Sequence, residues 1–163
     1  QYAVVPTTVN ITTASSWSLA IAIRLLTPNL GVANQRILGQ NNGTTDGFRL
    51  SRSSIVNVIA STFNAGSGTA SLTSGVFNNG ITNVLHLTHT GTILTAYANG
   101  IQFGQDLTAV YSPTNNAMVI GLANGDSIYC DMELLSLKIW YSVLTQTQIL
   151  DDYYRIIKSL KQI

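Results

Sequence analysis

Residues 84–100 read VLHLTHTGTILTAYANG and carry the clearest strand pattern of the chain. Within 85–88 two leucines alternate with polar residues, and within 94–98 Tyr97 faces away from the smaller apolar residues. A repeat of two places alternate side chains on opposite faces of a β-strand. The Asn-Gly pair that ends the stretch tolerates the positive φ of tight hairpin turns. The stretch therefore predicts two strands, each with one buried face, followed by a tight turn.

The same pattern extends outward along the chain as short apolar runs separated by turn residues. Nine runs are predicted as strands: 17–26, 36–40, 48–52, 55–62, 75–77, 84–88, 93–98, 118–122 and 133–139. Further Asn-Gly pairs at 42–43, 79–80 and 124–125, an Asp-Gly pair at 46–47 and a glycine-rich stretch at 66–68 mark turns between them. Because no helical pattern lies between the runs, the fold class is all-β, an antiparallel sandwich or barrel.

The C-terminal segment 145–162 has a different period. Thr145 and Gln148 stand at capping-box spacing for the start of a helix. Apolar residues then recur at helical spacing: Ile149, Leu150, Tyr153, Tyr154, Ile156, Ile157, Leu160 and Ile163. We expect one domain over 1–163, with a β-sandwich at 16–144 and a closing helix. The helix either packs on the sandwich or pairs with another subunit.

The composition excludes several classes of protein. The chain has 163 residues, of which 45% are hydrophobic and only 9% charged, so it can fold but has a neutral, hydrogen-bonding surface. A net charge of +1 gives no electrostatic footprint for nucleic acid. No apolar run is long enough to span a membrane. The lone Cys130 excludes an internal disulfide and is expected to be buried.

The neutral, hydrogen-bonding surface favours an extracellular or virion-surface protein. Because the chain starts at Gln1 with neither a Met nor a signal peptide, we expect a processed chain or an excised fragment.

Four motifs carry a resemblance to a known family. They are SWSLAIAIR at 16–24, GFRL at 47–50, LTHTG and LTAYANG within 87–100, and VIG at 119–121 with LKIWYSVLT at 137–145. In this order they resemble the laminin-G-like, concanavalin-A-like lectin/glucanase family, and most of all the single-domain jelly rolls of secreted and phage proteins. The resemblance runs over 17–149 and implies a two-sheet jelly-roll sandwich.

The chain also departs from that family. The family usually has a Trp at the position of Ala22, and a Trp-His pair near 82–84, so the interior is expected to be repacked. Its members bind sugars, proteins and lipids through varied loops, so the fold alone supplies no site.

The acidic residues give weak indications of catalysis or metal binding. Asp131 and Glu133 are the only carboxylate pair on a predicted strand, about 7 Å apart by strand rise. A glycoside hydrolase needs two such groups, but no third carboxylate continues the pattern, and we expect no catalytic residue. No cofactor is expected. A calcium site remains an alternative where Asp46 follows Asn41 and Asn42, or where Asp126 follows Asn124, although each offers one carboxylate.

The two histidines cannot act together. His86 and His89 are three residues apart on a strand and so point to opposite faces, which rules out a shared zinc site or relay. Sugar binding requires less, namely an exposed aromatic face with amides and carboxylates beside it. The candidate ligand-binding residues are Asn41, Asn42, Asp46, Tyr97, Asn99, Tyr111 and Tyr129, with Tyr141 as a further aromatic. Trp17 and Trp140 are interpreted as core.

Two functions remain, with a third at a distance. The first is a non-catalytic binding module on a virion or secreted particle that recognises a host glycan or cell-surface polysaccharide. The second is a structural or decoration protein that contacts other virion proteins or its own copies through the C-terminal helix and the apolar N-terminal segment 2–6. The third is a glycoside hydrolase. Nucleic acid and membrane insertion are not expected.

Overall fold

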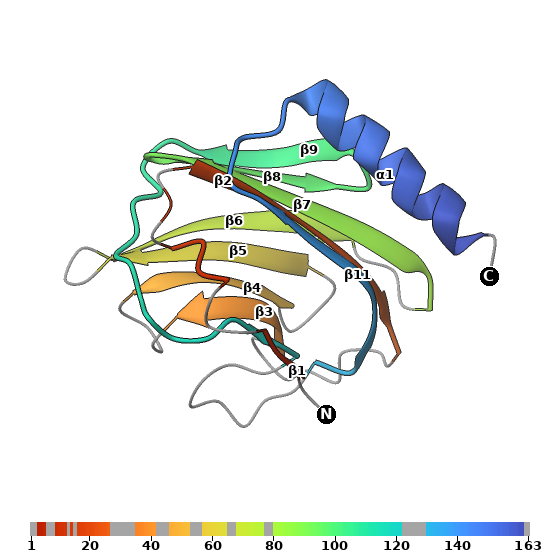
Figure 1. The fold of residues 1–163 in the computed structure, drawn as a ribbon, viewed down its shortest axis with the longest axis horizontal. Coiled ribbons are helices and arrows are strands. Elements are labelled where there is room, and N and C mark those ends of the chain that lie inside the picture. The colour runs from red at the N-terminus through yellow and green to blue at the C-terminus, as the bar shows by residue number, and fades with distance from the viewer. Residues whose placement is uncertain are drawn as a thin grey trace.

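The structure is a computed structural model that describes residues 3–5, 9–12, 14, 16–26, 35–41, 46–52, 57–64, 68–76, 80–121 and 130–161. The elements in chain order are β1 (Ala3–Val4), β2 (Ser16–Leu25), β3 (Gln35–Asn41), β4 (Gly47–Arg52), β5 (Asn57–Asn64), β6 (Gly68–Val76), β7 (Thr82–Thr90), β8 (Ile93–Ala98), β9 (Ile101–Asp106), β10 (Val119–Ile120), β11 (Met132–Trp140) and α1 (Gln146–Leu160). Figure 1 shows their arrangement.

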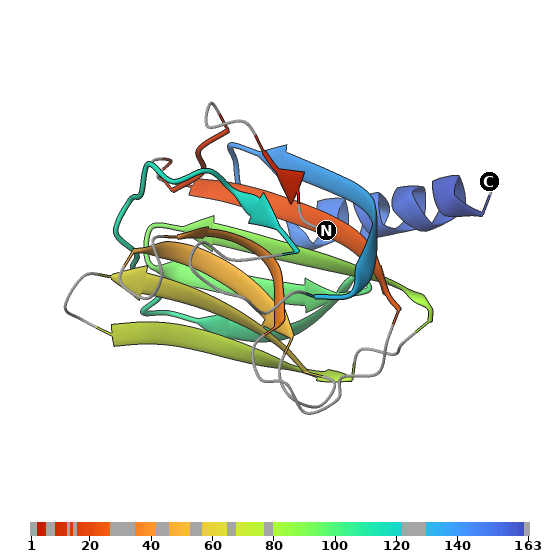
Figure 2. The same ribbon diagram turned by 90° about the horizontal axis from the view of Figure 1, so that it is seen from below.

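The strands form two antiparallel sheets stacked face to face. The six-stranded sheet has the order β1-β10-β3-β4-β5-β6, and the five-stranded sheet has the order β11-β2-β7-β8-β9. At one edge of the six-stranded sheet, β1 and β10 lie side by side near the N-terminus (Figure 2). The predicted two-sheet sandwich with a C-terminal helix is confirmed.

All nine predicted runs correspond to strands, and two strands were not predicted. Strand β6 is longer than the expected 75–77, and β10 is shorter than the expected 118–122. The two additional strands are β1, with two residues, and β9, whose residues are mostly polar or exposed. β9 forms as the partner of β8 across the turn at Asn99 and Gly100, whose φ angles of 52° and 80° confirm the expected left-handed geometry.

The core lies between the sheets. On β2 and β7 alternate large residues point inward, with Leu19 paired to Leu87 and Ile21 paired to Leu85, and all four are fully or almost fully buried. Phe48 and Leu50 of β4 face them from the other sheet. The strict alternation of these strands is what one buried face of a sheet requires. Cys130 is 5% exposed, so the expected burial is confirmed, and this burial raises the pKa of its thiol to about 11.

The outer face of the five-stranded sheet is built from small residues and is covered by α1. Ala20 and Ala22 of β2 lie there beside Val84, and Ile156 of the helix packs onto them. Figure 1 shows the helix on the side of this sheet that faces away from the six-stranded sheet. The small side chain of Ala22, where the resembling family has Trp, leaves room for the helix.

The helix begins where the sequence indicates. Thr145 accepts a hydrogen bond from the backbone N–H of Gln148, and Gln148 returns one to the N–H of Thr145, which completes the predicted capping box. The helix lies within the expected 145–162. Of the two expected alternatives, packing on the sandwich and pairing with another subunit, the structure shows the first.

Candidate functional site

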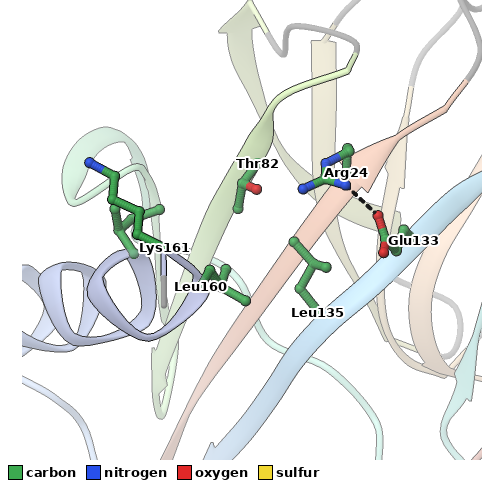
Figure 3. A pocket seen from close by; sticks show the side chains of 7 residues that line it. Arg24, Thr82, Glu133, Leu135, Leu160 and Lys161 are labelled. Atoms are coloured by element: carbon green, nitrogen blue, oxygen red, sulfur yellow. Dashed lines mark hydrogen bonds and ion pairs between the residues drawn. The ribbon is translucent and has the colours of Figure 1, made fainter. Parts of the chain in front are cut away.

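A groove lies between the C-terminal half of α1 and the adjoining end of the five-stranded sheet. At this end of the sheet, Arg24 of β2 pairs with Thr82 of β7 on one side and with Glu133 of β11 on the other. The groove has a volume of about 490 Å³ and is lined by Arg24, Thr82, Glu133, Leu135, Ile157, Leu160 and Lys161. We call it the basic groove. Figure 3 shows Leu160 pointing from the helix toward Leu135 of the sheet, whereas the ammonium end of Lys161 points away from Arg24.

The walls of the basic groove are apolar and its rim is charged. Leu135, Ile157 and Leu160 pack against the small cluster beneath the helix. At the rim, Nη1 of Arg24 donates to Oε2 of Glu133 at 2.8 Å, and the two side chains are 42% and 47% exposed. An ion pair this exposed contributes about 0–1 kcal/mol to folding. It therefore orients the guanidinium without being needed for stability.

The charges at the rim sum to a positive value. Arg24 and Lys161 each contribute one positive charge, Glu133 one negative charge, and the C-terminus of α1 about half a negative charge. The balance is about half a positive charge. Among the described residues, Nε and Nη2 of Arg24 and Nζ of Lys161 form no hydrogen bond. The groove therefore presents free N–H donors above an apolar wall, as ligand pockets of about 300–1,000 Å³ do.

A buried polar cluster fixes the helix on the sheet beside the groove. Oδ2 of Asp152 accepts from Nε2 of His86 at 3.1 Å, and Oδ1 accepts from Nζ of Lys138 at 2.5 Å. Burial lowers the pKa of His86, while the hydrogen bond and charge of Asp152 oppose that shift. The pair has the composition of a catalytic dyad, but His86 is 1% exposed, so no substrate reaches it. We interpret the cluster as the anchor of α1.

The expected separation of the two histidines is confirmed. His86 contacts the helix on the outer face, whereas His89 lies inside the sandwich with its ring stacked on Trp17 at 5.6 Å. Across the described ranges, no three side chains of the metal-binding types gather into one site.

Two of the predicted aromatic platforms, Tyr97 and Tyr111, have rings that pack against other residues. Tyr97 lies on the outer face of the sheet but is only 7% exposed, and burial raises the pKa of its hydroxyl, which is hydrogen-bonded to Thr88. Tyr111 accepts a hydrogen bond from Nε1 of Trp17 at 2.8 Å, and its ring lies 4.6 Å from that of His89. Both rings make packing contacts, and ligand binding by Tyr111, which is partly exposed, stays a prediction.

The remaining predicted residues have mixed outcomes. Oδ1 of Asn99 accepts the N–H of Val84 at 2.9 Å and so stabilises the hairpin turn, and ligand binding by Asn99 stays a prediction. Asn41 ends β3 opposite Gly47, and Asp46 is partly buried just before β4. Asn42, Tyr129 and the alternative calcium loop at 124–126 lie outside the described residues. Ligand binding at 41–46 stays a prediction.

Sequence reasoning missed the residues that form the basic groove. Arg24 and Lys161 are 137 positions apart in the chain; Arg24 is a lone cation in an apolar run, and Lys161 is one of three cations spaced along the C-terminal segment. Only the docking of α1 brings them together. The one available signal was the small side chain of Ala22, which makes room for an element on the outer face.

Comparisons with known proteins support the fold. No protein-family model matches the chain, and no curated protein matches it in sequence. Among solved structures, the CBM40 domain of the Ruminococcus gnavus IT-sialidase, bound to α2,3-sialyllactose, has a TM-score of 0.68 at 16% identity, covering 86% of this chain and 83% of that one. The binding domain of botulinum neurotoxin serotype G has a TM-score of 0.72 at 14% identity, covering 97% of this chain.

A third similar structure is the binding domain of botulinum neurotoxin DC in complex with SialylT, with a TM-score of 0.67 at 10% identity over 89% of this chain. The chain spans only 40% and 36% of the two neurotoxin domains. These likenesses place the chain among β-sandwiches of the lectin-like kind.

Proposed function

We propose that this chain is a non-catalytic glycan-binding domain and that the basic groove is its ligand site. The observation that carries the proposal is the combination, in one groove, of an apolar wall and unpaired N–H donors from Arg24 and Lys161. One similar structure is bound to α2,3-sialyllactose and another is in complex with SialylT, which supports a sialylated ligand here.

The chemistry of the groove favours an acidic sugar. A carboxylate on the sugar would accept from the guanidinium of Arg24, and the ammonium of Lys161 reaches the same carboxylate once its flexible side chain turns toward the groove. Charge-assisted bonds of this type are about twice as strong as neutral ones. The hydroxyl of Thr82 can bond to a ring hydroxyl, and Leu160 can pack against the C–H face of the sugar. Glu133 holds Arg24 in place for this contact.

The setting we propose is extracellular, on a secreted particle or a virion, where such a domain would attach to host-surface glycans. Across the described ranges, no helix combines the length and apolar character needed to cross a bilayer. Membership of the laminin-G-like, concanavalin-A-like family and a single domain over 1–163 stay predictions, and the lectin-like neighbours support the first of them.

Titration calorimetry with α2,3-sialyllactose, and with lactose as the uncharged comparison, tests the proposal. We expect sialyllactose to bind, lactose to bind at least tenfold more weakly, and Lys161→Ala and Arg24→Ala each to weaken sialyllactose binding at least tenfold. Lys158→Ala is the matched control, because Lys158 lies in the same last turn of α1 but outside the groove. Equal binding by the Lys158 and Lys161 variants, or none by the parent protein, overturns the proposal.

A second candidate function, protein–protein contact in a viral particle, draws on a different surface. Leu150 and Tyr154 of α1 are 37% and 60% exposed, and Tyr141 and Val143 just before it are 59% and 40% exposed. Grouped apolar exposure of this kind is typical of contact surfaces. Light scattering decides: a monomer at high protein concentration rules out self-association through this surface.

The hydrolase alternative has less support. Asp131 precedes β11, and the carboxylate of Glu133 is engaged with Arg24. If the chain hydrolysed a glucan, Asp131→Asn would abolish the reaction, which an assay for released reducing ends would detect.

A further inference from the structure

A second pocket lies on the opposite side of α1 from the basic groove. It has a volume of about 260 Å³ and is lined by Trp140, Leu144, Gln148, Asp151, Asp152 and Arg155. We call it the tryptophan pocket. At about 100° per residue, Gln148, Asp151 and Arg155 fall along one side of the helix, whereas Ile157 and Lys161 of the basic groove fall on the other.

The aromatic wall of this pocket is held in a fixed position. Trp140 ends β11 opposite Ser18 of β2 and is partly buried against the cluster under the helix. The hydroxyl of Ser18 donates to the carbonyl of Ser142 at 2.8 Å and accepts from the N–H of Leu144 at 2.9 Å. These two bonds fix the connection between β11 and α1, so the indole and Leu144 form a preorganised apolar surface.

The polar groups of the pocket are available for a ligand. The capping box engages Oε1 of Gln148, which leaves the amide Nε2 as a donor. Asp151 and Arg155 stand four residues apart, at the spacing for a helical ion pair, yet in the described chain neither forms one. The pocket therefore offers a carboxylate acceptor, a guanidinium donor and an amide donor beside an aromatic ring.

We propose that the tryptophan pocket binds a single uncharged pyranose ring, separately from the acidic sugar of the basic groove. Asp151 and Asp152 are balanced by Arg155 and by Lys138, so the pocket has no net charge to attract an anion. An aromatic face packs on the C–H face of a sugar ring, and adjacent hydroxyls bond to a carboxylate and to N–H donors. Its volume is just below the range of larger ligand pockets, which fits one ring.

The inference rests on the proposed function only in that both ligands are sugars. The protein therefore has two chemically different contacts on the two sides of one helix, and a branched or extended glycan can occupy both. Over the seven residues from Gln148 to Arg155 the helix rises about 10 Å.

Saturation-transfer NMR and tryptophan fluorescence with methyl glycosides of glucose, galactose, mannose and N-acetylglucosamine test the proposal. Because Trp17 is fully buried, a change in fluorescence on titration reports on Trp140. We expect at least one glycoside to bind, Asp151→Asn and Arg155→Ala to weaken it at least tenfold, and Trp140→Phe to weaken it less than Trp140→Leu. Lys158→Ala, which replaces an exposed cation outside both pockets, should leave binding unchanged.

Two outcomes overturn the inference: no glycoside of the panel binds, or binding persists unchanged in Asp151→Asn and Arg155→Ala. Both variants replace exposed side chains, so they are expected to fold. Sialyllactose titrations on the same variants separate the two proposals. In Asp151→Asn and Arg155→Ala, loss of glycoside binding with sialyllactose binding intact supports two separate sites. Loss of sialyllactose binding in these variants refutes the basic groove as the site of the acidic sugar, whereas loss of glycoside binding in Arg24→Ala and Lys161→Ala refutes the tryptophan pocket.

Discussion

The two faces of the five-stranded sheet each carry one tryptophan and one histidine, and the two pairs are used differently. On the inner face, Trp17 is fully buried, its ring lies 5.6 Å from that of His89, and its Nε1 donates to Tyr111. On the outer face, Trp140 is partly exposed and His86 bonds to Asp152 of the helix.

The difference lies in what covers each face. A complete second sheet covers the inner face, and large apolar side chains fill the space between the sheets. A single helix resting on alanines covers the outer face, and one helix is too narrow to close it, so a pocket remains on each side. Both pockets therefore lie on the outer face, and the helix is a wall of each.

The tryptophan pair should show the largest contrast in stability. Trp17→Ala removes a fully buried ring and leaves Tyr111 without its donor, so we expect a loss of about 3–5 kcal/mol in the free energy of unfolding. Trp140→Ala removes a ring that keeps contact with solvent and should cost less than half as much. Urea denaturation followed by far-ultraviolet circular dichroism measures both. Equal losses would mean that the outer face is packed as tightly as the inner face.

The aspartate pair on the helix should show the next largest contrast. Asp152→Ala leaves the buried Nε2–H of His86 without its acceptor, so we expect a loss of about 1–3 kcal/mol. Asp151→Ala alters an exposed neighbour and should change stability by less than about 0.5 kcal/mol. Chemical denaturation of the two variants side by side checks the difference. Similar values would show that the buried cluster does not anchor the helix.

The sequence was sufficient to predict the sandwich and the helix because their signals are local. Alternation around Leu85 and Leu87 identified a strand, and Thr145 with Gln148 identified the start of the helix. The expectation of one buried face was wrong for β7, whose residues from Asn83 to His89 are buried on both faces. β9 was missed because its residues alternate weakly and it is held by pairing with β8 across the turn at Gly100. Pairing of that kind does not appear in a single strand's pattern.

The candidate sites could not be predicted in the same way. Tyr97 and Tyr111 were chosen as aromatic platforms because alternation shows which face a residue takes but not whether another element covers that face. For the same reason Trp140 was interpreted as core, although its exposed part lines a pocket that exists only after α1 has docked.

Two glycines in hairpin turns of the same sheet test how closely the helix approaches it. Gly91 and Gly100 have φ angles of 58° and 80°, so an alanine at either costs about 1–2 kcal/mol in backbone strain. An added Cβ at Gly91 meets nothing within 4 Å, whereas at Gly100 it would lie 2.9 Å from Cδ1 of Leu150. Gly100→Ala should therefore destabilise by about 1 kcal/mol more than Gly91→Ala. Thermal unfolding gives the comparison, and identical melting temperatures would contradict the docked position of α1.

The two histidines predict a smaller effect that depends on pH. Burial lowers the pKa of both, and for His86 the carboxylate of Asp152 opposes that shift, whereas His89 has only the carbonyl oxygen of Ala109. In the unfolded chain each histidine binds a proton near its ordinary pKa of about 6.5. In the native state the lowered pKa means that each histidine binds a proton only at lower pH. Stability is thus fully present above pH ~6.5 and falls below it, by at most about 1.4 kcal/mol per pH unit for each histidine. His89→Phe, which keeps a ring beside Trp17, should flatten this acid-side loss more than His86→Phe does. Unfolding free energies measured from pH 8 to pH 5 test this prediction. If the unfolding free energy falls more steeply with decreasing pH in His89→Phe than in His86→Phe, the outer histidine, not the inner one, resists protonation more strongly.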